Sequence, residues 1–255
     1  MVDLSIGIVT YNSENEIEGL LRSIFEYTSG LSFHVYVVDN MSQDSTVRLI
    51  HEKFPQVTVI ESKVNNGFGH GHNQVLPVLD SRYHAIVNPD ILLNCDVFKY
   101  LVEYMDVHSE CVICTPKVLN SDGTEQHLPK RRPTFKYLFG GRLEAYGEIF
   151  KKIRREYTMA DRNLTEPTEI EFCTGCFMVM RTEIFQKCRG FDERFFMYFE
   201  DADLSDRARQ YGKIIFHPHT QVIHKWERTS SKKFKFLKIH LQSYFRYVIK
   251  NITSK

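Results

Sequence analysis

Short apolar segments alternate with amphipathic ones along the first part of this chain, and polar side chains follow three of the apolar segments. A strand–helix–strand order of this kind predicts an α/β fold with a mainly parallel central sheet covered by helices. The expected strands cover residues 4–9, 33–38, 57–61 and 84–87, and later 171–181, 213–217 and 221–224, with Pro218 separating the last two. An amphipathic helix that opens at residues 13–16 is expected to present Ile17, Leu20, Leu21 and Ile24 on one face. Because ligands bind at the carboxyl ends of parallel strands, we expect a site there. The polar residues at three of these ends are Asn12, Asp39 and Asp90.

Length, composition and charge fit one domain with a short appendage. The 255 residues are 42% apolar, enough for a sizeable core, and the net charge of +1 gives no nucleic-acid signature. The N-terminus lacks the features of a signal peptide, and no apolar run reaches the roughly 18 residues of a membrane span. The six cysteines are then expected to be free thiols. We expect a cytoplasmic protein with one domain over 1–230 and an amphipathic basic helix over 231–255.

Three carboxylates follow a dense aromatic run within residues 195–203. A carboxylate beside apolar side chains is partly desolvated, which raises its pKa and makes it a better base. The alternative is a helix start, since acids in a first turn favour the positive end of the helix dipole. Both interpretations can hold together. The three acids are Glu200, Asp201 and Asp203.

Other residues with suggestive chemistry lie at strand ends and in a glycine-rich loop. Asp39 can accept a hydrogen bond from a nucleobase imide N–H, or it can form a turn and cap a helix. The loop over residues 65–73 has three alternating glycines, which let the backbone approach a ligand closely. Asp90 supplies one carboxylate, which is enough for a divalent ion that keeps waters and binds a diphosphate. His224 ends another apolar segment and is either a ligand or a structural histidine.

Two basic segments depart from the regular pattern. Residues 125–169 carry interleaved basic and aromatic residues, and we expect either a solvated loop or a flap that meets an anionic partner. From residue 228 onward the chain has Lys and Arg but no Asp or Glu, and its apolar residues have helical spacing. This tail fits an amphipathic helix on an anionic membrane surface, or one packed on the domain or on a second subunit.

Several motifs occur together in a fixed order. The N-terminal ones are Thr10-Tyr11-Asn12, Val37-Val38-Asp39-Asn40, Asn66-Gly67-Phe68-Gly69 and Asn88-Pro89-Asp90. The C-terminal ones are Gly190-Phe191-Asp192-Glu193, Glu200-Asp201-Ala202-Asp203 and Val222-Ile223-His224. Over about residues 3 to 230 the chain resembles family 2 glycosyltransferases with the GT-A fold, and the C-terminal motifs resemble the bacterial rhamnosyltransferases of O-antigen and cell-wall polysaccharide synthesis.

The resemblance implies an inverting sugar transfer in which Asp201 is the general base and Glu200 orients the acceptor or its neighbour. It implies that the nucleotide sugar is bound by Thr10, Tyr11, Asn12, Asp39, Asn66, Gly67, Asn73 and Asn88. It also implies a divalent metal, Mn²⁺ or Mg²⁺, at Asp90 and His224, although Asn88 replaces the first acid of the metal motif. Phosphate and acceptor contacts are expected from Trp226, Arg228, Thr229, Ser230, Arg131 and Arg132.

The same resemblance favours dTDP-β-L-rhamnose as the donor and a polyprenyl-diphosphate-linked glycan as the acceptor. The enzyme would then lie peripherally on the inner face of the cell membrane, as a monomer or a homodimer. Alternatives are the same chemistry with another nucleotide sugar such as a UDP-hexose, a GT-A-like scaffold without catalysis, and a nucleotidyltransferase. The presence of Asp39, Asp90, Asp201 and His224 together argues against a scaffold. The lack of an N-terminal glycine-rich pyrophosphorylase-type loop argues against the nucleotidyltransferase.

Overall fold

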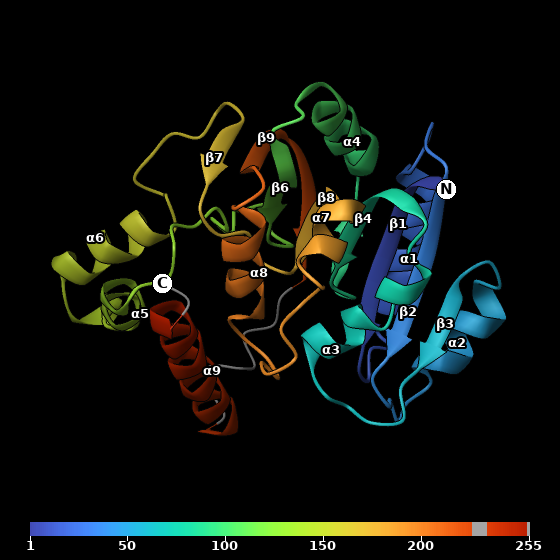
Figure 1. Cartoon of the computed structure of the whole chain (residues 1–255), viewed down its shortest axis with the longest axis horizontal. Helices are drawn as coiled ribbons and strands as arrows, with labels where there is room; N and C mark the ends of the chain where they lie inside the picture. Colours follow the sequence, from blue (N-terminus) through green and yellow to red (C-terminus); the bar gives the residue numbers. More distant parts are fainter. Residues whose placement is uncertain (226–233, 254–255) are drawn as a thin grey trace.

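The computed structural model describes residues 1–225 and 234–253, which form an α/β fold around one curled sheet (Figure 1). The strands are β1 (Val2–Thr10), β2 (Phe33–Asp39), β3 (Thr58–Glu61), β4 (Ser81–Val87), β5 (Ile91–Leu93), β6 (Cys111–Leu119), β7 (Thr168–Ile170), β8 (Phe177–Arg181) and β9 (Lys213–His224). The helices are α1 (Ile17–Tyr27), α2 (Thr46–Lys53), α3 (Phe68–Asn73), α4 (Val97–Val107), α5 (Phe135–Arg142), α6 (Glu148–Tyr157), α7 (Thr182–Lys187), α8 (Glu200–Ala208) and α9 (Phe234–Thr253).

The described strands are ordered β3-β2-β1-β4-β8-β6-β9-β5, and β7 pairs with β9. β1 pairs in parallel with β2 on one side and with β4 on the other, and β2 pairs in parallel with β3. The chain thus moves outward from β1 to β3 and then returns to the opposite side of β1. This reversal creates a switch point at the carboxyl ends of β1 and β4, where open α/β sheets bind ligands.

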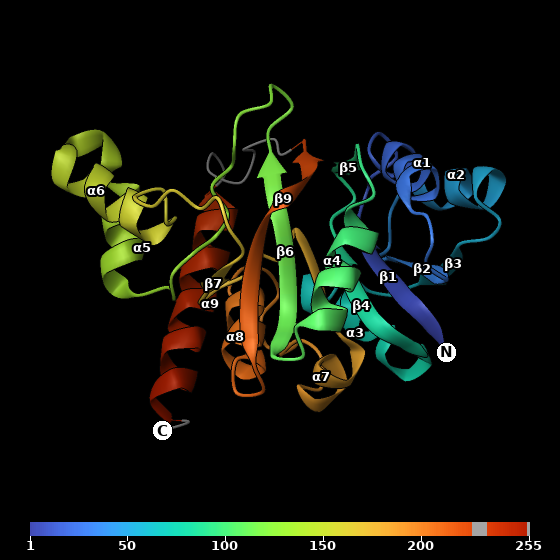
Figure 2. The ribbon, with the colours of Figure 1, turned by 90° about the horizontal axis from the view of Figure 1, so that it is seen from above.

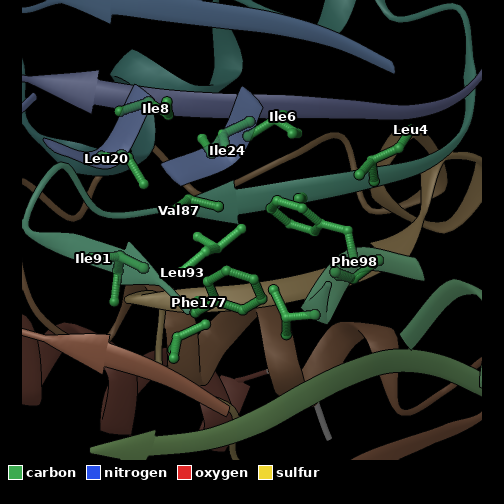
Figure 3. Packing of buried hydrophobic residues seen from close by; sticks show 14 of the residues in the cluster. Leu4, Ile6, Ile8, Leu20, Ile24, Val87, Ile91, Leu93, Phe98 and Phe177 are labelled. Carbon is green, nitrogen blue, oxygen red and sulfur yellow. The ribbon is translucent and has the colours of Figure 1, made fainter. Parts of the chain in front are cut away.

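The main core fills the space between one face of the sheet and helices α1 and α4 (Figure 3). Alternate residues of a strand point to one face, and β1 contributes Leu4, Ile6 and Ile8. α1 presents the predicted apolar face, on which Leu20 and Ile24 are fully buried. The rings of Phe98 on α4 and Phe177 on β8 stack with their centroids 5.3 Å apart. Burying each such side chain stabilises the fold by about 1.5–3 kcal/mol.

The second half of the sheet contains antiparallel pairings, and two sequence-based predictions fail there. β8 runs antiparallel to β4 and β6. The strand predicted over residues 171–181 is wrong in its first part, because β7 pairs with β9 and the chain must cross over to reach β8. The two strands predicted around Pro218 are one strand, β9. The register of β6 against β9 shifts between Pro116 and Lys117, and this irregularity accommodates Pro218 within β9.

Within the expected excursion over residues 125–169, the chain forms helices α5 and α6 before it returns to the sheet at β7, and these helices lie on the same side of the molecule as α9 (Figure 2). A separate aromatic cluster joins these helices to the start of α8. Its buried members include Tyr157, Phe172, Phe199, Tyr244 and Tyr247. The tail helix therefore packs on the domain, which was one of its expected positions. Among the described residues, none of the helices combines the length and apolar character that a bilayer span requires.

Two polar anchors reinforce the packing of α9. The ammonium group of Lys250 forms ion pairs with Asp192, at 2.7 Å, and with Asp203. The hydroxyl of Ser243 donates to the carbonyl oxygen of Met197 at 2.8 Å. Asp203 also pairs with Arg207 at 2.8 Å, as expected for an i, i+4 pair on a helix. The end of the chain is thus tied to the segment that begins α8.

Two buried histidines make the fold sensitive to acid. His84 on β4 is bonded to the Ser5 hydroxyl at 2.8 Å, and burial lowers the pKa of His84 to about 3. Burial, and secondarily His84, lower the pKa of His72 well below its ordinary value. Both are neutral when folded but charge near pH 6.5 when unfolded, so the free energy of unfolding is highest above pH 6.5 and falls as the pH drops.

We expect His84→Gln to make this pH dependence shallower. Removing one such histidine should reduce the loss of unfolding free energy between pH 7 and pH 5 by about 2 kcal/mol. Urea unfolding at both pH values measures the difference. His51→Gln is the control, because His51 is exposed on α2. An unchanged slope in His84→Gln would show that His84 does not titrate differently on unfolding.

Candidate active site

A pocket of about 550 Å³ opens at the switch point of the sheet, beyond the carboxyl ends of β1, β2 and β4. Its size suits a small organic ligand. Its polar lining includes Thr10, Tyr11, Asn12, Asn40, Asn65, Asn88, Asp90 and Lys225. Gly67, Phe68, Phe196 and Met197 form another part of the wall. The structure therefore brings together the ends of β1 and β4 and the glycine-rich loop, as the sequence predicted.

Asp39 lies behind this pocket and does not line it. Its carboxylate accepts hydrogen bonds from the Thr10 hydroxyl at 2.9 Å, the Ser42 hydroxyl at 2.6 Å and the Ser42 N–H at 2.8 Å. This geometry fits the turn-forming role, although a carboxylate can accept a further bond. The next residue, Asn40, does line the pocket, and its buried Oδ1 has no hydrogen-bond donor among the described residues. Sequence reasoning did not single out Asn40 as a site residue.

The glycine-rich loop contacts the aromatic run directly. Gly67 has φ +97°, and its carbonyl accepts a bond from Asn40 Nδ2 at 3.1 Å. Asn65 lines the pocket, whereas the predicted Asn66 is exposed and does not. Asn73 is also outside the pocket lining, and its amide bonds the backbone of Phe191 in both directions, at 2.8 and 2.9 Å. Asn73 therefore connects α3 to the segment before α8.

Replacing Gly67 by Ala should destabilise the loop severely. A Cβ there would lie 1.9 Å from the Phe196 carbonyl oxygen, in a left-handed conformation that an L residue adopts only with strain. We expect the free energy of unfolding to fall by about 3 kcal/mol or more, which urea unfolding measures. Gly123→Ala is the matched control, since Gly123 has φ +83° but open space around its Cβ position. Equal losses in the two variants would mean that the Phe196 contact is unimportant.

Asp90, which lines the pocket, lies beside His224, although the two are far apart in sequence. Asp90 Oδ1 lies 3.3 Å from Nε2 of His224, because β5 pairs Ile91 with His224. The other ring nitrogen, Nδ1, lies 2.9 Å from Oε1 of Gln126, whose amide nitrogen donates to the His224 carbonyl at 2.9 Å. Gln126 therefore orients the ring. Sequence reasoning missed Gln126, since nothing local connects it with a histidine 98 residues away.

This pair fits a divalent cation. With the amide of Gln126 placed as above, Nδ1 carries the proton, so the lone pair of Nε2 points toward Asp90. Asp90 Oδ1 is buried and accepts no hydrogen bond from the described residues. A carboxylate oxygen and an imidazole nitrogen are both ligands that a divalent cation would accept here. No third His, Cys, Asp or Glu joins them in the described parts of the chain, so further ligands would have to be water or substrate oxygens.

Glu200 and Asp201 open helix α8 beside the pocket wall. The two residues before them, Tyr198 and Phe199, both have left-handed backbones, at φ +71° and +69°. Such strain in non-glycine residues is uncommon and is concentrated at functional sites. The Gly175 N–H donates to Asp201 Oδ2 at 3.1 Å. Gly175 lies between Asp201 and Phe68, which lines the pocket. A Cβ added to Gly175 would lie 3.5 Å from the Asp201 Cβ and 3.1 Å from the Phe68 ring, so Asp201 is close to the pocket wall.

The surroundings of the two acids raise their pKa values to different extents. Glu200 is only 6% exposed, and burial together with the charge of Asp201 raises the pKa of Glu200 well above its ordinary value. Burial also raises the pKa of Asp201, but the Gly175 N–H bond opposes that shift. Two adjacent buried carboxyls do not both ionise readily. The raised pKa of Glu200 favours its neutral form, whereas the hydrogen bond from Gly175 favours the negative charge on Asp201.

Arg131 and Arg132, two of the predicted phosphate and acceptor contacts, do not line the pocket. Arg131 donates to the Glu156 carbonyl at 3.0 Å, and Arg132 pairs with Asp206 at 3.0 Å and bonds Asn251 at 2.7 Å. Both arginines thus hold the excursion and α9 in place. The other predicted phosphate and acceptor residues lie outside the described part of the chain. They are Trp226, Arg228, Thr229 and Ser230.

Known proteins share this sequence pattern and fold. A family model of glycosyl transferase family 2 matches residues 5–189. The chain is 25% identical over 236 residues to the N-acetylglucosaminyl-diphospho-decaprenol L-rhamnosyltransferase of Mycobacterium tuberculosis, covering 87% of this chain and 75% of the relative. It is 24% identical to rhamnosyltransferase WbbL of Escherichia coli, covering 95% of this chain and 91% of the relative.

A solved structure shows the same architecture. The mannosyltransferase PcManGT from Pyrobaculum calidifontis, in complex with GDP-Man and Mn²⁺, superposes with a TM-score of 0.65 at 17% identity. The match covers 98% of this chain but only 64% of the mannosyltransferase, so this chain spans less than two thirds of that protein. The family match extends over most of the residues that build the pocket. The chain therefore belongs to glycosyl transferase family 2, and it is a glycosyltransferase with the GT-A fold.

Proposed function

We propose that this chain is an inverting transferase that moves L-rhamnose from dTDP-β-L-rhamnose to a lipid-linked or polysaccharide acceptor in bacterial surface glycan synthesis. The observation that carries the proposal is the acid pair at the start of α8, which adjoins a pocket at the switch point of the sheet. The choice of rhamnose is supported by the names of the two relatives, at 24–25% identity.

In the proposed reaction the acceptor hydroxyl oxygen attacks C1 of the donor sugar from the face opposite the nucleotide. A carboxylate oxygen of Asp201 takes the hydroxyl proton as the new C–O bond forms. The bond between C1 and the diphosphate oxygen breaks, and its electron pair leaves with the nucleoside diphosphate. Glu200, whose raised pKa favours the neutral form, would donate a hydrogen bond without competing as a base. One displacement through an oxocarbenium-like transition state inverts the anomeric centre.

The pocket residues would bind the donor during this step. Thr10, Tyr11, Asn12 and Asn88 line the cavity, and Asn40 offers a buried carbonyl oxygen to an N–H or O–H of the ligand. Asp90 and His224, with Gln126 orienting the ring, would hold Mn²⁺ or Mg²⁺. When bound, the cation would stabilise the negative charge that gathers on the departing diphosphate.

A membrane-borne acceptor is proposed on two grounds. The mycobacterial relative is named for a decaprenol-linked substrate. On α9, the side chains of Phe245, Ile249 and Ile252 are 59%, 60% and 70% exposed, on a helix without acidic residues. A basic helix with exposed apolar side chains favours an anionic bilayer, which would place the enzyme on the inner face of the cell membrane. Alternatively, the same exposed side chains of α9 would form the interface of a homodimer.

A donor panel with a synthetic lipid-linked acceptor tests the proposal. Transfer from dTDP-β-L-rhamnose should exceed transfer from UDP-hexoses, and anionic liposomes should bind the intact protein. Faster transfer from a UDP-hexose would contradict dTDP-β-L-rhamnose as the donor but would leave the proposed type of reaction unchanged. Nucleotide binding without any transfer would favour a scaffold. Failure to bind anionic liposomes would contradict the proposed membrane association.

A further inference from the structure

The turn over residues 195–199 joins one wall of the pocket to the acid pair. Phe196 and Met197 line the pocket, and the acid pair begins α8 at residue 200. The two residues in between, Tyr198 and Phe199, have left-handed backbones. Non-glycine residues keep such conformations only where the surrounding structure holds them. The placement of the acid pair relative to the pocket therefore depends on the contacts that hold this turn.

Two different helices hold consecutive carbonyl groups of this turn. The Phe196 oxygen accepts a hydrogen bond from the N–H of Phe68, the first residue of α3, at 3.1 Å. The Met197 oxygen accepts one from the hydroxyl of Ser243 on α9 at 2.8 Å. α8 lies between α3 and α9 in both views of the ribbon (Figure 1 and Figure 2). Ser243 is only 2% exposed, so water does not readily take over the role of its hydroxyl group.

Aromatic side chains of α9 also pack on the left-handed part of the turn. The ring centre of Phe199 lies 5.1 Å from that of His240, 5.7 Å from that of Tyr244 and 5.5 Å from that of Tyr247. Phe199 and both tyrosines are buried. The Tyr247 hydroxyl donates to Asp206 Oδ2 on α8 at 2.6 Å. One face of α9 therefore contacts the turn and the helix that carries the acid pair.

We propose that Ser243 is a positioning residue, which fixes the Met197 carbonyl and thereby keeps the acid pair in place beside the pocket. Ser243 is not among the described residues that line the pocket, so it acts through Met197. Without the hydroxyl group, the Met197 oxygen loses a buried donor and one contact that holds the strained turn is gone. A displacement of about 1 Å in a reacting site costs up to about 10²-fold in rate. The effect on transfer rests on the proposed function, whereas the hold on the turn does not.

Amide hydrogen exchange tests the hold on the turn without any activity assay. In Ser243→Ala, exchange over residues 195–201 should quicken by about tenfold, the effect of losing one buried hydrogen bond, while β1 keeps its wild-type rate. Ser243→Thr retains the hydroxyl group and should restore slow exchange. Ser81→Ala is the matched control, because Ser81 is also buried and bonded, to the Ser5 hydroxyl at 2.8 Å, but lies at the opposite end of β4 from the pocket. Unchanged exchange over 195–201 in Ser243→Ala would overturn the proposal.

Transfer kinetics distinguish positioning from a general loss of stability. Ser243→Ala should lower kcat by about tenfold and leave KM for the nucleotide sugar within about twofold, because the hydroxyl group serves the geometry of the reacting site. Ser243→Thr should recover most of kcat, and Ser81→Ala should keep both constants. A loss confined to KM, or an equal loss of kcat in Ser81→Ala, would overturn the proposal. If the wild type transfers no sugar, the proposed function fails, and the exchange rates alone decide whether Ser243 holds the turn.

Discussion

Replacing Asp201 by Asn should lower the rate of sugar transfer by about 10²–10⁴-fold, the usual contribution of a general base. The amide has the shape of the carboxyl group but cannot accept the acceptor proton. Asp201 is not among the described residues that line the pocket, so the affinity for the nucleotide should stay within a few-fold of the wild type. Steady-state transfer kinetics and calorimetric titration with dTDP measure the two quantities on the same preparation.

Glu200→Gln is the matched comparison for this prediction. Burial and the charge of Asp201 raise the pKa of Glu200 and favour its neutral form, so a neutral amide should replace it with a loss of about 10-fold or less. If Glu200→Gln and Asp201→Asn lost activity equally, the assignment of the base to Asp201 would be unsupported. If only Glu200→Gln lost activity, the roles of the two acids would be reversed.

Replacing Asp90 by Asn should reduce transfer by about 10²-fold at fixed Mn²⁺ concentration. The substitution removes the only carboxylate of the proposed metal pair, leaving His224 and a weaker amide ligand. Mn²⁺ binding in the presence of dTDP, followed by electron paramagnetic resonance, should weaken in parallel. The variant should also need a higher metal concentration for half-maximal rate, since its affinity and not its chemistry is impaired.

Asp80→Asn is the control for the metal prediction, since Asp80 precedes the same strand at its opposite end and is exposed. Its transfer rate and Mn²⁺ affinity should equal those of the wild type. Excess chelator should abolish wild-type transfer, and added Mn²⁺ or Mg²⁺ should restore it. Undiminished transfer in chelator would contradict the proposed roles of both Asp90 and His224.

The parallel half of the sheet was predictable because its information is local. Each strand is a short apolar run, and the residues after β1 and β4 line the pocket in their expected positions. The same local pattern misjudged residues 171–176, whose path depends on β7 and β8 having different neighbours. It also misjudged Pro218, since whether a proline breaks a strand depends on a bulge across the ladder.

The residues that the sequence did not reveal act through distant contacts. Gln126 orients a histidine on β9. Tyr157 of α6 packs in the aromatic cluster that reaches the start of α8, although composition alone described this excursion only as basic and aromatic. Arg131 and Arg132 were singled out for their charge, but their partners were unknown, and the structure shows them bracing α6 and α9. Charge can be read from a sequence, whereas the groups that neutralise it are set by tertiary packing.

The anomeric configuration of the product tests the central claim most directly. Transfer from dTDP-β-L-rhamnose to a synthetic acceptor, followed by NMR of the new glycosidic linkage, distinguishes the two outcomes. A single displacement with Asp201 as the base predicts an α-L-rhamnoside as the only product. A β-L-rhamnoside would require a retaining mechanism and would contradict the roles assigned here to the acid pair.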